Sequence, residues 1–342
     1  MTTVAISYRP KVDFFSSDFF SAQYGDKHTP LPCWQKVLIV VFGILLVGIG
    51  GLALSYYWRD RLVQQLYEAD YQKTKRQFQK THPFVEKLGG GSSTMIKIAF
   101  LFLVTSHITH ESIWQNFFKG NDERSSIYVH VKESLDATSA FKQHEMATKV
   151  ETTWERTMCA QIALLKEALK DPTNEKFVFV SGDSLPIQKF NFVYQQLMQH
   201  SLSIFNYSWN NHQDPDSTFY YPKRKLDGIP YEKQFKNSQW VVLSRKHAEM
   251  MVEDNEIISQ VIQSTCDNEH YPSTFLAVQN LLSEVVNQPT MLTLWHRGYA
   301  HPFTFNDMDD RYQTEQLSEA MNQGILFARK FDKQCNVKSC KI

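Results

Sequence analysis

The segment at residues 266–272 (CDNEHYP) concentrates side chains that could do acid–base chemistry. It places the carboxylate of Glu269 beside a histidine and aromatic residues, directly after an apolar stretch over 250–262 that predicts a helix. A carboxylate in a partly apolar pocket tends toward a raised pKa, which suits a general base that takes a proton from an attacking hydroxyl. An ordinary loop acid would have the same local sequence, so this segment alone leaves both interpretations open.

Two Asp-x-Asp triplets could bind a divalent cation, because carboxylate oxygens suit hard metal ions. Asp214 and Asp216 form one, Asp307 and Asp309 the other, and both lie in polar, loop-like sequence rather than after an apolar strand. That setting favours solvated acidic turns. The sequence also has no H-E-x-x-H motif and no Cys-x-x-Cys pair, so zinc has no support. We therefore expect no metal and no other cofactor.

Several other chemistries lack their sequence signature. The chain has no G-x-G-x-x-G, no P-loop and no G-x-S-x-G elbow. Its cysteines are too few for a disulfide scaffold, and Cys159, Cys266, Cys335 and Cys340 allow three full pairings that the sequence does not separate. Residues 206–208 form a glycosylation sequon at Asn206, which has meaning only in a lumenal domain.

An uncharged run at the N-terminal side predicts a membrane anchor. Its 22 residues, 37–58, would form a helix of about 33 Å at about 1.5 Å per residue, enough to cross a bilayer core of about 30 Å. Aromatic residues at its end suit the membrane interface, whereas flanking charges do not decide the orientation. We expect a tail over 1–36, the anchor over 37–58, a helical stalk with a Gly/Ser linker over 59–94, and a globular head over 95–342.

The head alternates short apolar runs with stretches of helical periodicity. Strands are predicted over 96–104, 126–131 and 177–180, and helices over 111–119 and 157–170. This alternation implies a doubly wound α/β sheet with ligands at the carboxyl ends of its strands.

The overall composition excludes two further classes of protein. Lys and Arg number 36 and so do Asp and Glu, so the chain lacks the basic surplus of a nucleic-acid binder. Hydrophobic residues make up 42% of the chain, which excludes disorder on a large scale.

In this order, the segments of the head resemble the core-2/I-branching beta-1,6-N-acetylglucosaminyltransferase family, in particular its plant and protist relatives. Residues 113–120 (IWQNFFKG) are similar to the family's Leu-Trp-x-x-Phe-Phe-Lys-Gly helix, and 268–271 (NEHY) to its Asp-Glu-His-Tyr motif. The other matching segments are 97–103 (KIAFLFL), 126–131 (SIYVHV), 177–186 (FVFVSGDSLP), 238–246 (SQWVVLSRK), 295–305 (WHRGYAHPFTF) and 326–331 (LFARKF). The resemblance covers nearly all of residues 96–332.

The resemblance implies a GT-A-like, nucleotide-sugar-binding sheet and an inverting glycosyltransferase that needs no metal ion. It implies a single-pass type II protein of the Golgi membrane, with the tail in the cytoplasm and the head in the lumen. The implied donor is a UDP-sugar, with N-acetylglucosamine favoured and glucuronic acid or xylose as alternatives. The implied acceptor is a hydroxyl of a glycan or glycoprotein.

The resemblance also implies roles for charged residues of the head. Glu269 stands at the position of the family's general base. Lys330, with Arg329 beside it, would offset the negative charge that grows on the leaving diphosphate. A second arginine is also implied, for which we prefer Arg297 to Arg311 because Arg297 lies in a matching motif.

Further positions follow from the same resemblance. His130 and Val131 end the second strand, where the nucleoside base would bind, and Ser181 and Asp183 follow the third, where the diphosphate or donor sugar would pass. Two tryptophans could stack on the acceptor sugar, although packing in the core would use them equally well; these are Trp240 and Trp295.

Three departures from the family's pattern keep a second hypothesis open. Asn268 replaces the family's aspartate, and residues 104–107 differ from its usual Thr-Arg-Gly turn. Ser184 stands where the vertebrate enzymes have an aspartate, with Asp183 one place off. The alternative is a non-catalytic, lectin-like or scaffold protein with the same fold.

Overall fold

The computed structural model describes residues 95–209, 226–264, 266–295, 301–305 and 310–334. All of them belong to the second of two compact units, Gln64–Ile342. No helix within these ranges is long and apolar enough to cross a membrane. The expected tail, anchor and stalk and both Asp-x-Asp triplets lie outside the described residues.

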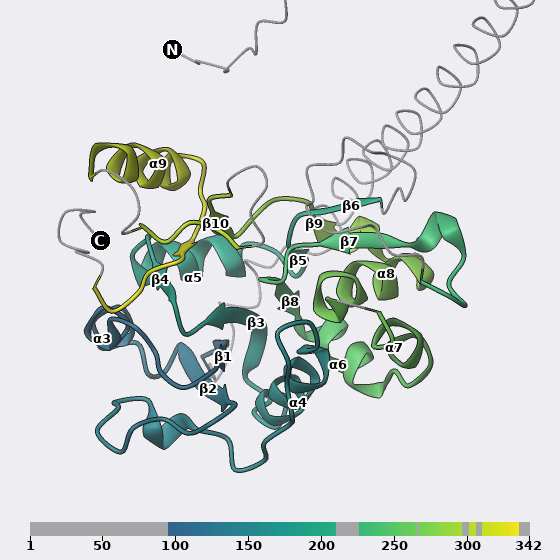
Figure 1. Ribbon diagram of the computed structural model, residues 1–342, viewed down its shortest axis with the longest axis horizontal. Coiled ribbons are helices and arrows are strands. Elements are labelled where there is room, and N and C mark those ends of the chain that lie inside the picture. Colours follow the sequence, from purple (N-terminus) through teal and green to yellow (C-terminus); the bar gives the residue numbers. More distant parts are fainter. Residues whose placement is uncertain (1–94, 210–225, 265, 296–300, 306–309, 335–342) are drawn as a thin grey trace, which may run out of the picture. The chain divides into compact units, whose positions relative to one another are not determined.

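A six-stranded sheet forms the centre of the head, in the order β2-β1-β3-β8-β5-β9 (Figure 1). Its strands are β1 (Lys97–Val104), β2 (Ser125–Val131), β3 (Asn174–Ser181), β5 (Ser203–Ile204), β8 (Val242–Ser244) and β9 (Val285–Val286). The first three run parallel, whereas β8 is antiparallel to both β3 and β5. The sheet is therefore mixed.

Two smaller sheets accompany the central one. One has the order β10-β11-β4, and the other pairs β6 with β7 in an antiparallel ribbon. Their strands are β4 (Ser184–Pro186), β6 (Tyr207–Trp209), β7 (Phe235–Asn237), β10 (Met291–Thr293) and β11 (Phe327–Arg329).

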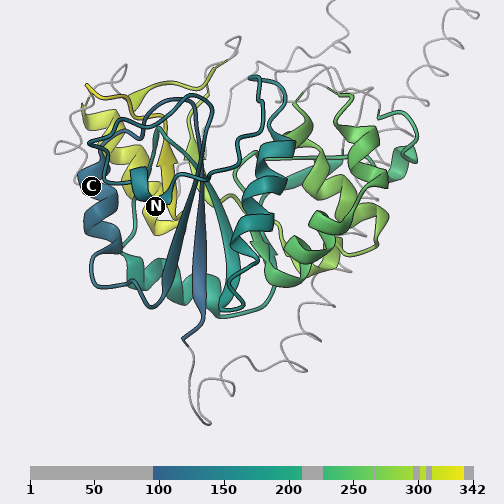
Figure 2. The ribbon, with the colours of Figure 1, turned by 90° about the horizontal axis from the view of Figure 1, so that it is seen from below.

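Strand β1 is apolar on both faces because helices cover both sides of the sheet. Phe100 and Phe102 point to one face, where the Trp114 ring of α3 (Glu111–Phe118) lies 4.9 Å from that of Phe102. The other face packs on α4 (Met158–Ala168) and α6 (Arg245–Glu253). Figure 2 shows the strands between these two layers. The predicted α/β fold with a central sheet is thus confirmed.

The remaining helices are α5 (Phe190–Met198), α7 (Glu256–Val261), α8 (Tyr271–Val278) and α9 (Asp310–Asn322), with short 3₁₀ turns η2 (Lys142–His144), η3 (Tyr231–Lys233), η4 (Asp267–Glu269) and η5 (Leu282–Glu284).

The prediction of a single helix over 250–262 is wrong, because α6 ends at Glu253 and a separate helix, α7, begins at Glu256. The Asp254 carboxylate accepts hydrogen bonds from the backbone N–H groups of Glu256, Ile257 and Ile258 at 2.8–3.2 Å. These donors would otherwise lack partners at the start of a helix, so Asp254 stabilises a new helix start inside the apolar stretch.

The carboxyl edge of the parallel strands collects the segments that carry the candidate residues. Helix α4 lies between β2 and β3 in the chain, so its N-terminus lies near the carboxyl end of β2. The turn after β3 and the loop after β1 belong to the same edge. Ligands in open α/β sheets bind at such an edge, which makes it the place to look for a site.

Candidate active site

Asp183, in the turn after β3, is the centre of a cluster of charges. Its two carboxylate oxygens accept hydrogen bonds from Nε and Nη2 of Arg329, both at 3.2 Å, and Oδ2 lies 3.8 Å from Nζ of Lys330. The Ser181 hydroxyl also donates to this carboxylate. Burial by itself raises the pKa of Asp183, but Arg329, Ser181 and Lys330 outweigh that effect and hold it below its ordinary value. Asp183 is therefore ionised at neutral pH.

The Trp240 ring packs against the Arg329 side chain of this cluster. The Arg329 guanidinium lies over its ring, 5.0 Å from the ring centroid, which is a cation–π distance. The Trp240 side chain is only 5% exposed. The structure thus places Trp240 in the packed layer beside Arg329, which agrees with the core alternative that the sequence left open.

Close packing fixes the turn that carries Asp183. The Gly182 carbonyl accepts a hydrogen bond from the Thr109 N–H at 2.7 Å, which joins the turn to the loop after β1. A Cβ atom at Gly182 would lie 2.5 Å from the carbonyl oxygen of His107, closer than such contacts allow. Residues 104–107, whose sequence departs from the family's pattern, are therefore in direct contact with this turn.

Glu269, at the end of η4, forms a second cluster. Its carboxylate lies 3.2 Å from Nζ of Lys236 on β7, and the two side chains are 25% and 6% exposed. A buried cation thus holds a carboxylate that remains open to solvent. Next to this pair, Nδ2 of Asn237 donates to the Asn268 carbonyl, so β7 fixes both the backbone and the side chain of the segment.

Asp267 joins η4 to the start of α4. Its Oδ1 accepts hydrogen bonds from the backbone N–H groups of Thr157 and Met158 at 3.1 Å, and its own N–H points to the Glu155 carbonyl. Burial raises the pKa of Asp267, although these donors act in the opposite direction. Asp267 therefore caps a helix more than 100 residues away in the chain and anchors Glu269 at the carboxyl edge.

A short segment connects the two clusters. Lys236, the partner of Glu269, precedes Trp240, the support of Arg329, by four residues. Four residues span at most about 14 Å between Cα atoms, even when fully extended. The carboxylate of Glu269 and the cations at Asp183 therefore belong to one region of the head.

His130 and Val131 at the end of β2 are both buried. His130 Nε2 accepts a hydrogen bond from the Val150 N–H at 3.0 Å, and burial lowers the pKa of the imidazole. Its Nδ1 has no hydrogen-bond partner among the described residues. The side chains predicted to contact the nucleoside base are thus covered by the loop that follows β2.

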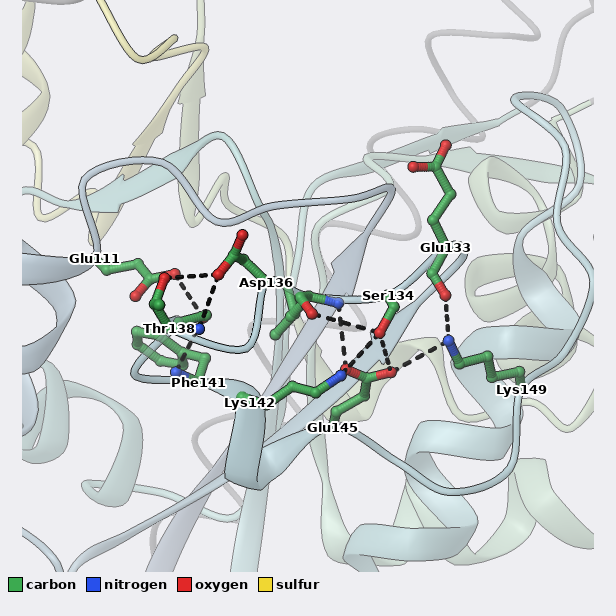
Figure 3. A network of polar contacts seen from close by, with 11 residues as sticks. Glu111, Glu133, Ser134, Asp136, Thr138, Phe141, Lys142, Glu145 and Lys149 are labelled. Carbon is green, nitrogen blue, oxygen red and sulfur yellow. Dashed lines mark hydrogen bonds and ion pairs between the residues drawn. The ribbon is translucent and has the colours of Figure 1, made fainter.

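Figure 3 shows the polar network that holds this loop. The Glu145 carboxylate bonds to Nζ of Lys142 at 2.8 Å, to Nζ of Lys149 at 3.2 Å and to the Leu135 N–H at 3.3 Å. Farther along, the Glu111 carboxylate of α3 accepts from Ser139 and Ala140. The loop is therefore tied both to itself and to α3.

Trp154 is an exposed aromatic residue that precedes, by a few positions in the chain, the backbone N–H groups that bind Asp267. Its side chain is 55% exposed, and its ring packs edge-on against His301 at 5.4 Å. Glu155, the next residue, bonds to Asp267 through its carbonyl, so Trp154 lies beside η4. Trp295, which the sequence proposed for the acceptor, is 53% exposed at the end of the β10 segment.

Other candidate residues lie away from the two clusters or outside the described residues. Arg297 is among the latter. Arg311 is on the surface of α9, 2.9 Å from Glu315. Asn206 is partly exposed between β5 and β6.

The cysteines and metal-ligating residues add no further site among the described positions. Cys159 and Cys266 are free thiols, and Cys335 and Cys340 lie outside the described residues. No group of three or more His, Cys, Asp or Glu side chains within the described ranges could hold a metal ion.

Sequence reasoning missed three residues of this region. Lys236 and Asp267 were not proposed, because their partners are far away in the chain. Trp154 stands alone in a polar stretch, and that isolation was the available signal for an exposed aromatic residue.

Comparisons with known proteins identify the family. Residues 98–320 match the model of the Core-2/I-Branching enzyme family. The chain is 30% identical over 308 residues to glycosyltransferase BC10 of Oryza sativa subsp. japonica, across 71% of this chain and 75% of the rice protein.

Two solved structures show weak similarity. One is 4-diphosphocytidyl-2C-methyl-D-erythritol synthase from Anaerococcus prevotii DSM 20548, at 11% identity and a TM-score of 0.31 over 57% of this chain and 88% of that one. The other is A197 from STIV, at 12% identity and a TM-score of 0.24 over 46% and 69%. The family match and the rice relative do decide the class: this chain belongs to the Core-2/I-branching enzyme family and is a glycosyltransferase.

Proposed function

We propose that the chain transfers a sugar from a UDP-sugar to a hydroxyl of a glycan or glycoprotein, with inversion and without a metal ion. The observation that carries this proposal is the pairing of two clusters at one edge of the sheet. Glu269 offers an open carboxylate, and the Asp183 cluster offers a cation, Lys330, whose side chain is 38% exposed. An inverting displacement needs a base on the acceptor side and positive charge on the leaving-group side.

In the proposed reaction, Glu269 takes the proton of the acceptor hydroxyl as its oxygen attacks the anomeric carbon. The bond between that carbon and the diphosphate oxygen breaks, and UDP leaves with the bonding electrons. Lys330 offsets the charge that develops on the diphosphate. Lys236 holds the Glu269 carboxylate in one orientation from its buried side.

The donor, acceptor and location belong to the same proposal. N-acetylglucosamine is the favoured donor sugar, with glucuronic acid and xylose as alternatives. We place the acceptor against the exposed rings of Trp154 and Trp295, since an aromatic face packs well on the apolar face of a pyranose. The uncharged run over 37–58 supports a Golgi type II membrane protein whose head, with the Asn206 sequon, lies in the lumen.

The test is sugar transfer by the full chain in detergent, with each UDP-sugar and excess EDTA. Glu269→Gln should lower turnover by about 10²- to 10⁴-fold, the usual contribution of a general base, and leave UDP affinity unchanged. Glu253→Gln, an exposed residue at the end of α6, is the matched control and should leave turnover unchanged.

Each other result has a definite meaning. Full turnover by the Glu269→Gln variant would refute the assigned base. Activity lost in EDTA would favour the metal-dependent alternative at Asp214 and Asp216. UDP-sugar binding without any turnover would favour the non-catalytic scaffold.

A further inference from the structure

We propose that Asp183 is a positioning residue that holds the Arg329 side chain in contacts within the protein. Lys330 is then the cation of this pair that contacts the diphosphate. This inference rests on the proposed function, since it needs a diphosphate in the site. It divides the work between two neighbouring cations that the sequence alone does not distinguish.

Arg329 is held on two sides. Its Nε and Nη2 donate to both oxygens of Asp183 at 3.2 Å, and the face of its guanidinium lies on Trp240. The side chain is only 15% exposed. A bidentate pair of this kind is directional and charge-assisted, so a diphosphate would have to break two hydrogen bonds and a ring contact to recruit Arg329.

Lys330 is held much less firmly. Its Nζ lies 3.8 Å from Asp183 Oδ2, which is beyond hydrogen-bonding distance, and its side chain is 38% exposed. Its backbone is fixed nonetheless, because the Lys330 carbonyl accepts the Phe305 N–H at 2.9 Å. The Lys330 backbone therefore stays in place while its ammonium group is free to turn toward an incoming anion.

Asp183 can enforce this division because it is itself fixed. The Ser181 hydroxyl donates to its carboxylate, and its carbonyl accepts the Phe331 N–H at 2.9 Å. The turn after β3 and the end of β11 are thus joined on both sides of the cations. Without the Asp183 charge, Arg329 would lose its acceptor and become free to bind an anion.

The experiment is a double-mutant cycle on UDP affinity, measured by calorimetry with the full chain in detergent and EDTA. Lys330→Ala should weaken UDP binding by about 10- to 100-fold, the loss expected for a hydrogen bond to a charged group. In an Asp183→Asn background the released Arg329 supplies the missing charge, so the same substitution should weaken binding less than about threefold.

A second pair of variants gives an independent readout. Arg329→Met should weaken UDP binding, because Asp183 then captures Lys330. Adding Asp183→Asn to that variant should restore the affinity, which a merely structural role for Arg329 would not predict. Near-UV circular dichroism checks that each variant is folded.

Equal losses for Lys330→Ala in both backgrounds, or no restoration in the Arg329→Met background, would overturn the division of roles. Absence of UDP binding by the unmodified chain would instead refute the proposed function, and this inference with it.

Discussion

At the scale of single residues, the candidate site is a set of charges whose positions are fixed by neighbouring side chains. Lys236 is 6% exposed and holds Glu269, while Arg329 is fixed by Asp183 and Trp240. Glu269 in the first cluster and Lys330 beside the second remain partly exposed to solvent. Under the proposed function, this arrangement keeps the reacting groups oriented before the substrate binds, which is how preorganised charges lower a barrier.

Trp154 gives the first residue-scale prediction. Trp154→Ala should raise the KM for the acceptor by about 5- to 30-fold, the loss of roughly 1–2 kcal/mol of apolar contact with a sugar ring, and should leave the donor KM unchanged. Trp154→Phe should keep most of the affinity because it retains an aromatic face. Initial rates at varied acceptor and donor concentrations measure both values.

Tyr312→Ala, an exposed aromatic residue on α9, is the control for that experiment. A raised donor KM with an unchanged acceptor KM would place the Trp154 ring on the donor sugar instead.

At the scale of elements, the loop between β2 and α4 is organised by Glu145. Burial alone would raise the pKa of the Glu145 carboxyl, but hydrogen bonds from Lys142, Lys149 and the Leu135 N–H lower it to about 2. Since the native pKa lies below the ordinary value, the ionised carboxylate stabilises the folded state above about pH 4.5. This contribution is lost as the pH falls toward 2.

Glu145→Gln should therefore lower the free energy of unfolding most at neutral pH. The gap to the unmodified chain should narrow steadily below pH 4.5, because protonation then removes the same interaction. Urea denaturation between pH 7 and pH 3 measures this difference in the free energy of unfolding. Glu167→Gln, which breaks an exposed pair with Lys170 on the surface of α4, is the control. A gap that stays constant with pH would contradict the assignment.

At the scale of the whole molecule, a lysine inside the central sheet sets a pH dependence of stability. Lys176 on β3 is buried, its Nζ donates to the Leu202 carbonyl, and burial lowers its pKa to about 7. Between that value and the ordinary value of 10.5, the unfolded chain binds more protons than the folded chain. Stability should therefore rise with pH across this window.

At pH 7 the free energy of unfolding of the Lys176→Met variant should be higher than that of the unmodified chain. Folding of the variant no longer requires a buried ammonium group to lose its charge. The advantage should shrink toward pH 10.5. Chemical denaturation at pH 7, 8.5 and 10 tests this, with the exposed Lys166→Met as control. A parallel pH dependence for the variant and the unmodified chain would refute it.

Elements that depend on a local pattern could be predicted from the amino-acid sequence. The apolar run of β1 and the helical spacing of α4 were predictable, since burial imposes a short period on neighbouring residues. Motifs such as the one around Glu269 were equally visible, because their residues are contiguous. These local patterns were sufficient for the fold class, for the family and for Glu269, Arg329 and Lys330 as candidates.

Tertiary structure alone decided which of these residues meet, and in what role. Asp183 and Arg329 are 146 positions apart, and Asp267 and Thr157 are 110 apart, so no local pattern joins them. The antiparallel direction of β8 is likewise a property of the assembled sheet. Each of these outcomes depends on packing between distant segments, and a side chain's electrostatic partner is known only once that packing exists.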